Sequence, residues 1–269
     1  MEKILNRENK PIVVYTALFG DYDFLIDPRE AYADCDFICF TDQESLQTEI
    51  WKPVMVNKKF SSPTVANRYF KWLPHLCLQE YEYSLYLDSN IILYTNPCEL
   101  VKEYLSKADI AMPGHPFREC LYEEAIACIR ENKLSLFQAL RQVNCYRRSG
   151  YPENHGLLEQ GIVLRRHNCE DVKKTMELMW GELKKWGTFR DQITFPYLAW
   201  KTGVNFLSMN ENSRQGNKFI YMPHRKRHRF WKKLFISISL RKRIYLDANI
   251  LRVYLKFTGL SLPYDQKKL

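Results

Sequence analysis

The sequence predicts an α/β fold in which a mainly parallel, Rossmann-like sheet is flanked by helices, with a basic helical extension at the C-terminus. Short apolar runs alternate with stretches of helical spacing in the first part of the chain, which is typical of doubly wound sheets. With 269 residues, 46% of them hydrophobic, the chain can bury one large core. No internal repeat or low-complexity linker divides it.

Apolar runs rich in β-branched and aromatic residues predict the strands. They cover residues 12–18, 36–41, 51–56, 83–93, 110–113 and 161–164. The run 83–93 differs from the others because Asp88 and Asn90 interrupt it. Burying a carboxylate costs roughly several kcal/mol unless a cation or hydrogen bonds compensate it. Asp88 is therefore expected either at the end of a strand, facing a cleft, or paired inside the protein.

Helical spacing and helix-start signals predict the elements between the strands. Ser62 and Pro63 suit a helix N-terminus, because serine caps the first turn and proline is tolerated early in it. The predicted helices cover residues 65–77, 122–143 and 169–185, and 122–143 is expected to be one long helical region. Residues 190–201 open with Arg190-Asp191-Gln192 before an aromatic run.

The net charge of +9 is concentrated near the C-terminus. Residues 225–269 hold 13 of the 40 lysines and arginines but two of the 31 acids, so this segment carries +11 and the rest of the chain −2. The composition therefore changes near residue 224. We expect one α/β domain over residues 1–224 and a basic extension over 225–269.

Cysteine usage and the N-terminus favour a reduced, intracellular protein. None of the eight cysteines forms a C-x-x-C pair, which argues against a zinc ribbon or a thioredoxin-like site. The first seven residues lack the apolar region of a signal peptide. No run approaches the roughly 18–20 apolar residues that span a bilayer.

Polar side chains stand at the ends of consecutive predicted strands. Ligands of open parallel sheets bind at the carboxyl ends of the strands, so these residues indicate one cleft. Asp88 and Asn90, two residues apart, would face the same side of an extended segment. One carboxylate and one amide oxygen suit Mg²⁺ or Mn²⁺ held jointly with phosphate oxygens. The alternative is an aspartate that caps a turn. The strand-end residues are Thr16, Asp21, Asp42, Asp88, Asn90 and His115.

Other polar residues are candidates for the same cleft, and each has a structural alternative. Arg68 and Lys71, three residues apart on a helix, could bind a diphosphate or form a solvated basic face. His115 lies in a turn where a structural role is open. Asp191 precedes Gln192 and could be an N-cap. His224 could be a third metal ligand or a structural histidine.

Five segments together resemble a glycosyltransferase-like domain family, long catalogued as a domain of unknown function, with plant mucilage-related members. Its organisation is similar to that of the family 8 glycosyltransferases, which have the GT-A fold. The likeness spans roughly residues 12–224. The segments are Val14–Asp23, Cys39–Asp42, Asn67–Lys71, Tyr86–Asn90 and Glu159–Gly161.

The resemblance implies a nucleotide-sugar-dependent glycosyltransferase with its catalytic domain in residues 1–224. It implies a base pocket at Thr16, Ala17, Leu18 and Tyr22, with Asp42 near the base or ribose. It places Arg68 and Lys71 near the ribose or diphosphate, and assigns Ser89 and His115 to the nucleotide-sugar site. Glu159, Gln160, Asp191 and Gln192 would face the donor sugar and acceptor as catalytic residues.

The resemblance also implies a Mn²⁺ or Mg²⁺ cofactor held by Asp88, Asn90 and His224. Asn90 departs from the family pattern, where many relatives have a second aspartate, and one negative charge fewer should weaken metal affinity. If the reaction inverts the anomeric carbon, Asp191 or Glu159 is the candidate base. Retention, which we favour, needs no base on the far face.

The basic extension interleaves cations with large apolar residues. Phe230, Trp231, Leu234 and Phe235 have helical spacing and would form one apolar face. We expect residues 225–243 to lie on an anionic membrane, which suits a glycan or lipid-linked acceptor in cell-envelope polysaccharide or lipopolysaccharide synthesis. The protein would then be cytoplasmic, at the inner face of a membrane. These aromatics could instead pack on the domain.

Two other functions remain open at this point. A phosphotransferase or phosphatase would use Asp88 as a nucleophile, but that class usually needs a second acid where Asn90 stands. A nucleic-acid-binding protein would use the basic extension. We consider nucleic acid the less favoured partner of that segment.

Overall fold

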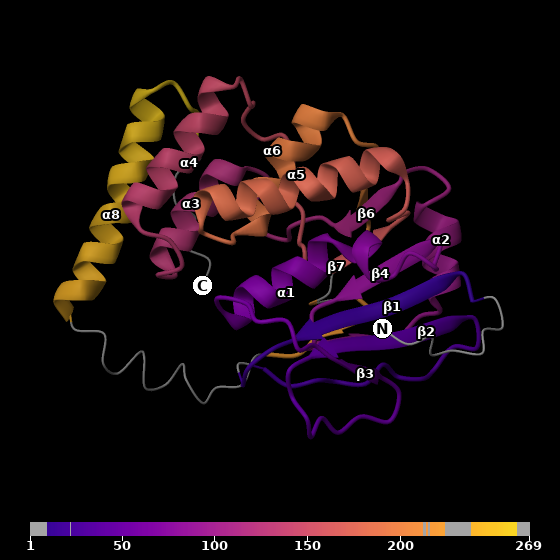
Figure 1. Cartoon of the computed structure of the whole chain (residues 1–269). Helices are drawn as coiled ribbons and strands as arrows, with labels where there is room; N and C mark the ends of the chain where they lie inside the picture. The colour runs from indigo at the N-terminus through magenta and orange to yellow at the C-terminus, as the bar shows by residue number, and fades with distance from the viewer. Residues whose placement is uncertain (1–9, 22, 212–213, 215, 224–237, 263–269) are drawn as a thin grey trace.

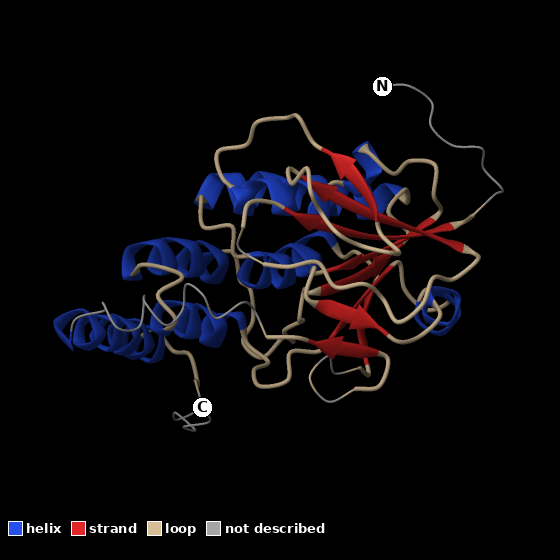
Figure 2. Cartoon of the chain, turned by 90° about the horizontal axis from the view of Figure 1, so that it is seen from below, coloured by secondary structure: helices blue, strands red, loops and turns tan. Residues whose placement is uncertain are grey.

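The computed structural model describes residues 10–21, 23–211, 214, 216–223 and 238–262. Within them a seven-stranded sheet has the order β3-β2-β1-β4-β7-β6-β8, and a small second sheet pairs β5 with β9 (Figures 1 and 2). The strands are β1 (Ile12–Leu18), β2 (Cys35–Thr41), β3 (Lys52–Met55), β4 (Tyr83–Leu87), β5 (Ile91–Leu93), β6 (Ile110–Pro113), β7 (Ile162–Arg165), β8 (Phe206–Met209) and β9 (Phe219–Tyr221).

The main sheet is mostly parallel, as predicted. β1, β2, β3 and β4 run in one direction, and β8 is parallel to β6. β7 is antiparallel to both of its neighbours, β4 and β6. The amino end of β7 therefore lies at the same edge of the sheet as the carboxyl ends of β1 and β4, and this edge carries the candidate site.

Both faces of the sheet are covered by other parts of the chain. Successive side chains of β1 point to opposite faces, and those on each face are buried in a separate core. Val13, Tyr15 and Ala17 belong to the larger core, on the side of most helices. Val14 and Leu18 belong to the core on the other side, which includes Leu100 of α2. The helices are α1 (Pro63–Trp72), α2 (Pro97–Tyr104), α3 (Leu121–Arg130), α4 (Leu136–Arg148), α5 (Glu170–Trp186), α6 (Asp191–Thr202) and α8 (Ile238–Phe257), with a 3₁₀ turn at Pro74–Leu76.

Local signals in the sequence set the helix ends. The Ser62 hydroxyl accepts a hydrogen bond from the Val65 amide at 3.2 Å and caps α1, which has Pro63 in its first turn. Ser135 and Gln138 form a capping box at the start of α4. Gly187 ends α5 with φ of +64°, a left-handed conformation that glycine adopts at no steric cost.

Two predicted elements are each divided in the structure. The single strand expected over 83–93 is wrong, because β4 ends at Leu87 and Asp88–Asn90 form a turn before β5 joins the second sheet. The single helix expected over 122–143 is also wrong, because Asn132, with φ of +54°, and the cap at Ser135 separate α3 from α4. Neither α2 nor the short strands β8 and β9 were predicted.

The described part of the basic extension packs against the domain. Ala248, Leu251 and Leu255 of α8 are fully buried in the larger core. The Tyr254 hydroxyl donates to Asn144 Oδ1 of α4 at 2.9 Å. Figure 1 shows α8, in yellow, as the outermost helix beside α3 and α4. The predicted boundary near residue 224 stays a prediction, because residues 224–237 lie outside the described residues.

None of the helices that the structure describes is both long enough and apolar enough to cross a membrane.

We expect Leu251→Ala to lower the free energy of unfolding by about 2–5 kcal/mol, because it leaves a cavity between α8 and the domain. Its neighbour Ile250 is 42% exposed, so Ile250→Ala is a matched control with a cost under about 1 kcal/mol. Urea unfolding of both variants measures the difference. Equal small costs would mean that α8 does not dock in solution as described.

Candidate active site at the carboxyl end of β4

Asp88 follows β4 directly and lies in a tight turn. Its amide donates to the Gly161 carbonyl at 2.8 Å, and its carbonyl accepts from the Ile91 amide at 2.9 Å. A Cβ at position 161 would lie 3.1 Å from Asp88 Oδ2 and 3.0 Å from Ile91 Cδ1, so glycine lets the start of β7 approach this closely. Of the two expected positions for Asp88, the structure therefore has the one at the end of the strand.

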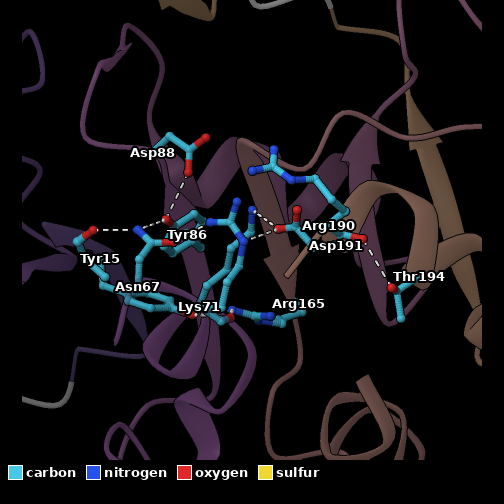
Figure 3. Close-up of polar contacts among 11 residues, drawn as sticks. Tyr15, Asn67, Lys71, Tyr86, Asp88, Arg165, Arg190, Asp191 and Thr194 are labelled. Atoms are coloured by element: carbon cyan, nitrogen blue, oxygen red, sulfur yellow. Dashed lines mark hydrogen bonds and ion pairs between the residues drawn. The ribbon is translucent and has the colours of Figure 1, made fainter. Parts of the chain in front are cut away.

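Two side chains orient the Asp88 carboxylate. The Tyr86 hydroxyl donates to Asp88 Oδ1 at 2.9 Å and accepts from Asn67 Nδ2 at 3.1 Å (Figure 3). Asn67 Nδ2 also donates to the Ala17 carbonyl at 2.6 Å. Burial, together with the charge of Asp88, raises the pKa of Tyr86 well above its ordinary value. Tyr86 therefore stays protonated and remains a donor to Asp88.

A buried carboxylate at the start of α6 joins this helix to α1. Asp191 Oδ2 lies 2.7 Å from Lys71 Nζ and 3.1 Å from Arg68 Nε. The Lys71 side chain is only 2% exposed and that of Asp191 9%, so the pair is shielded from water. Arg68 and Lys71 therefore belong to a buried charge cluster, which excludes the alternative of a solvated basic face.

The cluster changes the pKa values of its members. Burial alone would raise the pKa of Asp191, but the charges of Arg68 and Lys71 hold it well below its ordinary value. Burial lowers the pKa of Lys71, and the charges of Asp191 and Asp88 oppose that shift. Since Asp88 acts on both cations, its carboxylate belongs to the same electrostatic site.

A second buried arginine lies beneath the cluster. Arg165 of β7 is fully buried and donates to the Lys71 carbonyl at 2.6 Å and to the Tyr15 hydroxyl. The Tyr15 hydroxyl also contacts the Lys71 carbonyl, at 3.1 Å. Arg165 thus binds the carboxyl end of α1, where carbonyl groups favour a positive charge. This contact fixes the last turn of α1, from which Lys71 extends.

Asn90 joins the Asp88 turn to the segment before residue 224. Its Nδ2 donates to the Met222 carbonyl at 2.6 Å, and its carbonyl accepts from the Met222 amide at 2.9 Å. The predicted metal ligand His224, two residues further on, and the predicted base-pocket residue Tyr22 lie outside the described residues. Within the described residues no group of three or more histidine, cysteine, aspartate or glutamate side chains could hold a metal ion.

Gln160 is the buried residue of the Glu159-Gln160 pair. It is 3% exposed, and neither end of its amide has a hydrogen-bond partner among the residues that the structure describes. A buried amide without hydrogen-bond partners costs folding free energy, so this amide is a candidate to bind a polar ligand. Glu159 instead forms an ion pair with Arg214 at 2.9 Å. The guanidinium of Arg214 also lies over the ring of Tyr221.

The predicted base pocket is only partly open. Thr16, Ala17 and Leu18 are buried, although the Thr16 hydroxyl has no hydrogen-bond partner in the described part of the chain. Asp42 is exposed and accepts a hydrogen bond from the Gly20 amide at 2.9 Å. Next to them is an open depression of about 500 Å³. Its lining residues are Gly20, Asp21, Asp23, Asp42 and Gln43.

His115 has a turn-forming role in the structure. Its Nδ1 accepts hydrogen bonds from the Phe117 amide at 3.2 Å and the Arg118 amide at 3.0 Å. Burial, followed by the charges of Arg118 and Arg214, lowers the pKa of His115 to about 3. His115 is therefore neutral at pH 7 and offers no positive charge to a phosphate. Ser89 is buried in the Asp88 turn, and its carbonyl accepts from the Ile26 amide at 3.0 Å.

Sequence reasoning missed three residues of this site: Asn67, Tyr86 and Arg190. Arg190 precedes Asp191, and its guanidinium makes no hydrogen bond or ion pair with any described residue. In Figure 3 this guanidinium extends from α6 toward the side of Asp88. Phe189, before it, has φ of +49°, which is rare for a bulky residue and is found at functional sites. The charged run Arg190-Asp191-Gln192 was the signal in the sequence that could have indicated Arg190 as a site residue. The left-handed conformation of Phe189 cannot be predicted from that run.

We expect Asp191→Asn to lower the free energy of unfolding by about 3–5 kcal/mol at pH 7, because it leaves Lys71 as a buried charge without its partner. The folded-state pKa of Asp191 is depressed, so its stabilisation is full above the unfolded pKa of about 4 and declines as the pH falls below it. Urea unfolding at pH 7 and pH 3 should therefore give a smaller difference from wild type at pH 3. A pH-independent difference would contradict this assignment.

The double variant Asp191→Asn, Lys71→Met is the control, since it removes both charges of the closest pair. Its cost should be below the sum of the two single costs, because the variants share one interaction. Additive costs would mean that the two residues act separately.

Three solved glycosyltransferase structures are similar to the chain at low sequence identity. Mouse xyloside xylosyltransferase 1, in its apo form, is 14% identical, with a TM-score of 0.41 over 74% of this chain and 84% of that one. The bifunctional glycosyltransferase WbbM is 12% identical, with a TM-score of 0.43 over 93% and 45% of the two chains. The glycosyltransferase GlyE of Streptococcus pneumoniae TIGR4 is 11% identical, with a TM-score of 0.43 over 97% and 66%.

No curated protein matches the sequence. A family model described as the TOD1/MUCI70 glycosyltransferase-like domain matches residues 2–224, which include the whole site around Asp88. This match confirms the resemblance seen in the sequence motifs. The chain belongs to the TOD1/MUCI70 family of glycosyltransferase-like domains.

Proposed function

We propose that the protein transfers a sugar from a nucleotide-diphosphate donor to a hydroxyl group of a glycan or lipid-linked acceptor. The observation that carries the proposal is a charged site in which Arg68 and Lys71 of α1 pair with Asp191, while the Asp88 carboxylate at the carboxyl end of β4 acts electrostatically on both cations. A carboxylate can share a metal ion with a diphosphate, and cations can stabilise the negative charge that develops on it. Family membership makes transferase chemistry the reaction to test.

Arg190 is the cation best suited to contact the diphosphate directly. Lys71 and Arg68 are already paired with Asp191, whereas the guanidinium of Arg190 has no partner among the described residues. Arginine binds phosphate oxygens through two parallel hydrogen bonds. In this proposal, Arg190 contacts the diphosphate. The cluster of Arg68, Lys71 and Asp191, which holds two positive charges and one negative charge, adds a net positive charge to the site.

Asp88 and Asn90 could hold a divalent cation only together with other ligands, such as the phosphate oxygens of the donor and water. These residues offer one carboxylate and one amide group, and Asn90 Nδ2 donates to the Met222 carbonyl. Mg²⁺ and Mn²⁺ commonly take a few protein oxygens and complete their coordination with phosphate and water. When bound, the ion would neutralise charge on the departing diphosphate. His224, as predicted, could supply a nitrogen ligand.

The amide of Gln160 is proposed to bind the donor sugar. It is buried beside Gly161, whose carbonyl bonds to the Asp88 amide, and it lacks protein partners in the described part of the chain. Hydroxyl groups of a sugar would satisfy both its donor and its acceptor. Asp42 and the depression beside Gly20 are proposed to take the base or ribose.

The ion pairs of Asp191 bear on the choice between retention and inversion. In the proposed retaining reaction, the bond from the anomeric carbon to the diphosphate oxygen breaks and its electron pair stays on the diphosphate. The acceptor oxygen forms a bond to the anomeric carbon, and its proton passes to the departing diphosphate. Arg68 and Lys71 lower the pKa of Asp191, which makes its carboxylate a weak proton acceptor. Asp191 therefore suits the positioning of cations better than general base catalysis, which supports retention.

The alternative of phosphotransfer by Asp88 has less support. Its second acid would stand at position 90, and the Asn90 side chain donates a hydrogen bond to Met222 instead. Binding of an aspartyl-phosphate mimic that Asp88→Asn abolishes would favour this alternative over sugar transfer.

The acceptor proposal also keeps the predicted contact of residues 225–243 with an anionic membrane. Residues 224–237 lie outside the described residues, and Arg241, Lys242 and Arg243 are exposed at the start of α8.

We expect nucleoside diphosphates with Mn²⁺ to raise the melting temperature, and Asp88→Asn to abolish the metal-dependent part of that shift. The affinity should fall at least tenfold, or about 1.4 kcal/mol, because the carboxylate that holds the ion is lost. Thermal unfolding with a panel of nucleotides, with and without metal, measures both effects. The exposed residue Asp34 gives the matched control Asp34→Asn, and the proposal fails if no nucleotide stabilises the wild type.

Arg190→Gln should weaken the binding of a nucleoside diphosphate by roughly 10–100-fold, the effect of losing about 1.5–3 kcal/mol of charge-assisted hydrogen bonding. It should leave nucleoside binding unchanged and alter the melting temperature of the free protein little, because no ion pair or hydrogen bond of the guanidinium to a described residue is seen and its charge only adds to those already acting on Asp191. Isothermal titration with both ligands separates these effects. Arg148→Gln, at an exposed position of α4, is the control, and equal weakening of the nucleoside would disprove the diphosphate contact.

A further inference from the structure

Helix α8 has two apolar faces, and only one of them is covered. Ala248, Leu251 and Leu255 are fully buried in the larger core. At about 3.6 residues per turn, another four apolar residues fall in one line on the opposite side of the helix. These residues, which we call the outer stripe, are Leu246, Ile250, Val253 and Phe257.

The outer stripe is exposed along its whole length. Leu246 is 58% exposed, Ile250 42%, Val253 66% and Phe257 90%. Single exposed apolar residues are ordinary on protein surfaces, but a contiguous row rimmed by polar residues marks a contact site. Since α8 lies at the periphery of the molecule, beyond α3 and α4, the stripe is open to a large, flat partner (Figure 1).

The charges around the stripe indicate what that partner is. Helix α8 carries five lysines and arginines and a single acid, Asp247. By helical geometry, Lys242 and Lys256 flank the stripe on one side, and Arg243 and Asp247, one turn apart, flank it on the other. An apolar row with a basic margin is the pattern of a helix that lies in a membrane interface, with its cations at the level of anionic headgroups.

We propose that the outer stripe of α8 docks the protein on an anionic lipid surface. The stripe enters the interface while the buried face of the same helix stays in the domain core, so that the domain is held rigidly against the bilayer. The sequence predicts membrane-surface binding for the extension 225–269, with residues 225–243 as the contact. The proposal moves that contact to a defined face of the described helix α8. It does not depend on the proposed sugar transfer, and a membrane-bound acceptor is its natural counterpart.

The test is co-sedimentation of the full chain with vesicles of phosphatidylcholine alone or mixed with phosphatidylglycerol. We expect binding to the anionic vesicles that weakens with salt, and a loss of at least about tenfold in partitioning for the double variant Val253→Ser, Phe257→Ser. Leu178→Ser is the matched control, because Leu178 is 42% exposed on α5, and it should bind as the wild type does.

Two further measurements keep the outcome clear. The melting temperature and the nucleotide-induced shift of the double variant should equal those of the wild type, so a failure of docking is distinguishable from a failure of the proposed function. Vesicle binding that the double variant retains in full would overturn the proposal. So would a concentration-dependent dimer that the double variant abolishes, which would make a second copy the occupant, or salt-dependent RNA binding without vesicle binding.

Discussion

The rest of the candidate site depends on the buried ion pairs of Asp191 with Lys71 and Arg68. These contacts join α6 to α1 and hold two cations at the site, with Lys71 2% exposed and Arg68 18% exposed, so that water screens Lys71 little. A buried charge without a partner would be too costly to keep, so the carboxylate is what allows the cations to lie there. Arg165, beneath, fixes the carboxyl end of the same helix.

The Asp88 turn is positioned by the sheet instead of by charges. Its backbone is bonded to Gly161, at the start of β7, and its side chain to Tyr86, which belongs to β4 itself. Asn90 continues the same turn into the second sheet through Met222. The sheet therefore holds one part of the site, the Asp88 turn, and the helix pair α1 and α6 holds the other. Preorganised groups of this kind are what stabilisation of a leaving diphosphate requires.

The sequence predicted the sheet and the acidic turn, but not how the charges pair. Buried strands such as 12–18 are readable because nearly every residue is apolar or β-branched, and motif order identified the family. Whether Lys71 faces solvent or Asp191 depends on a contact across 120 residues, which spacing does not encode. Arg190 was overlooked because an arginine before a helix is ordinary; its unpaired guanidinium and the left-handed Phe189 are visible only in three dimensions. The outer stripe could not be distinguished in the sequence, because α8 has apolar residues on two sides and spacing does not show which side is buried.

The reversed direction of β7 has a consequence for how the protein can vary. Because β6 and β7 are antiparallel, the chain leaves the sheet after Pro113 and returns at Ile162 on the same edge, with Gly114 and Leu158 bridged at the exit. Residues 114–161, which include α3 and α4, therefore form one connection that leaves and rejoins the sheet at the edge where Asp88 lies. The buried faces of α3 and α4 belong to the larger core, so they cannot vary freely. The exposed turn at residues 131–133 can be lengthened or exchanged without altering strand order, so the fold confines variation on this connection to its surface turns.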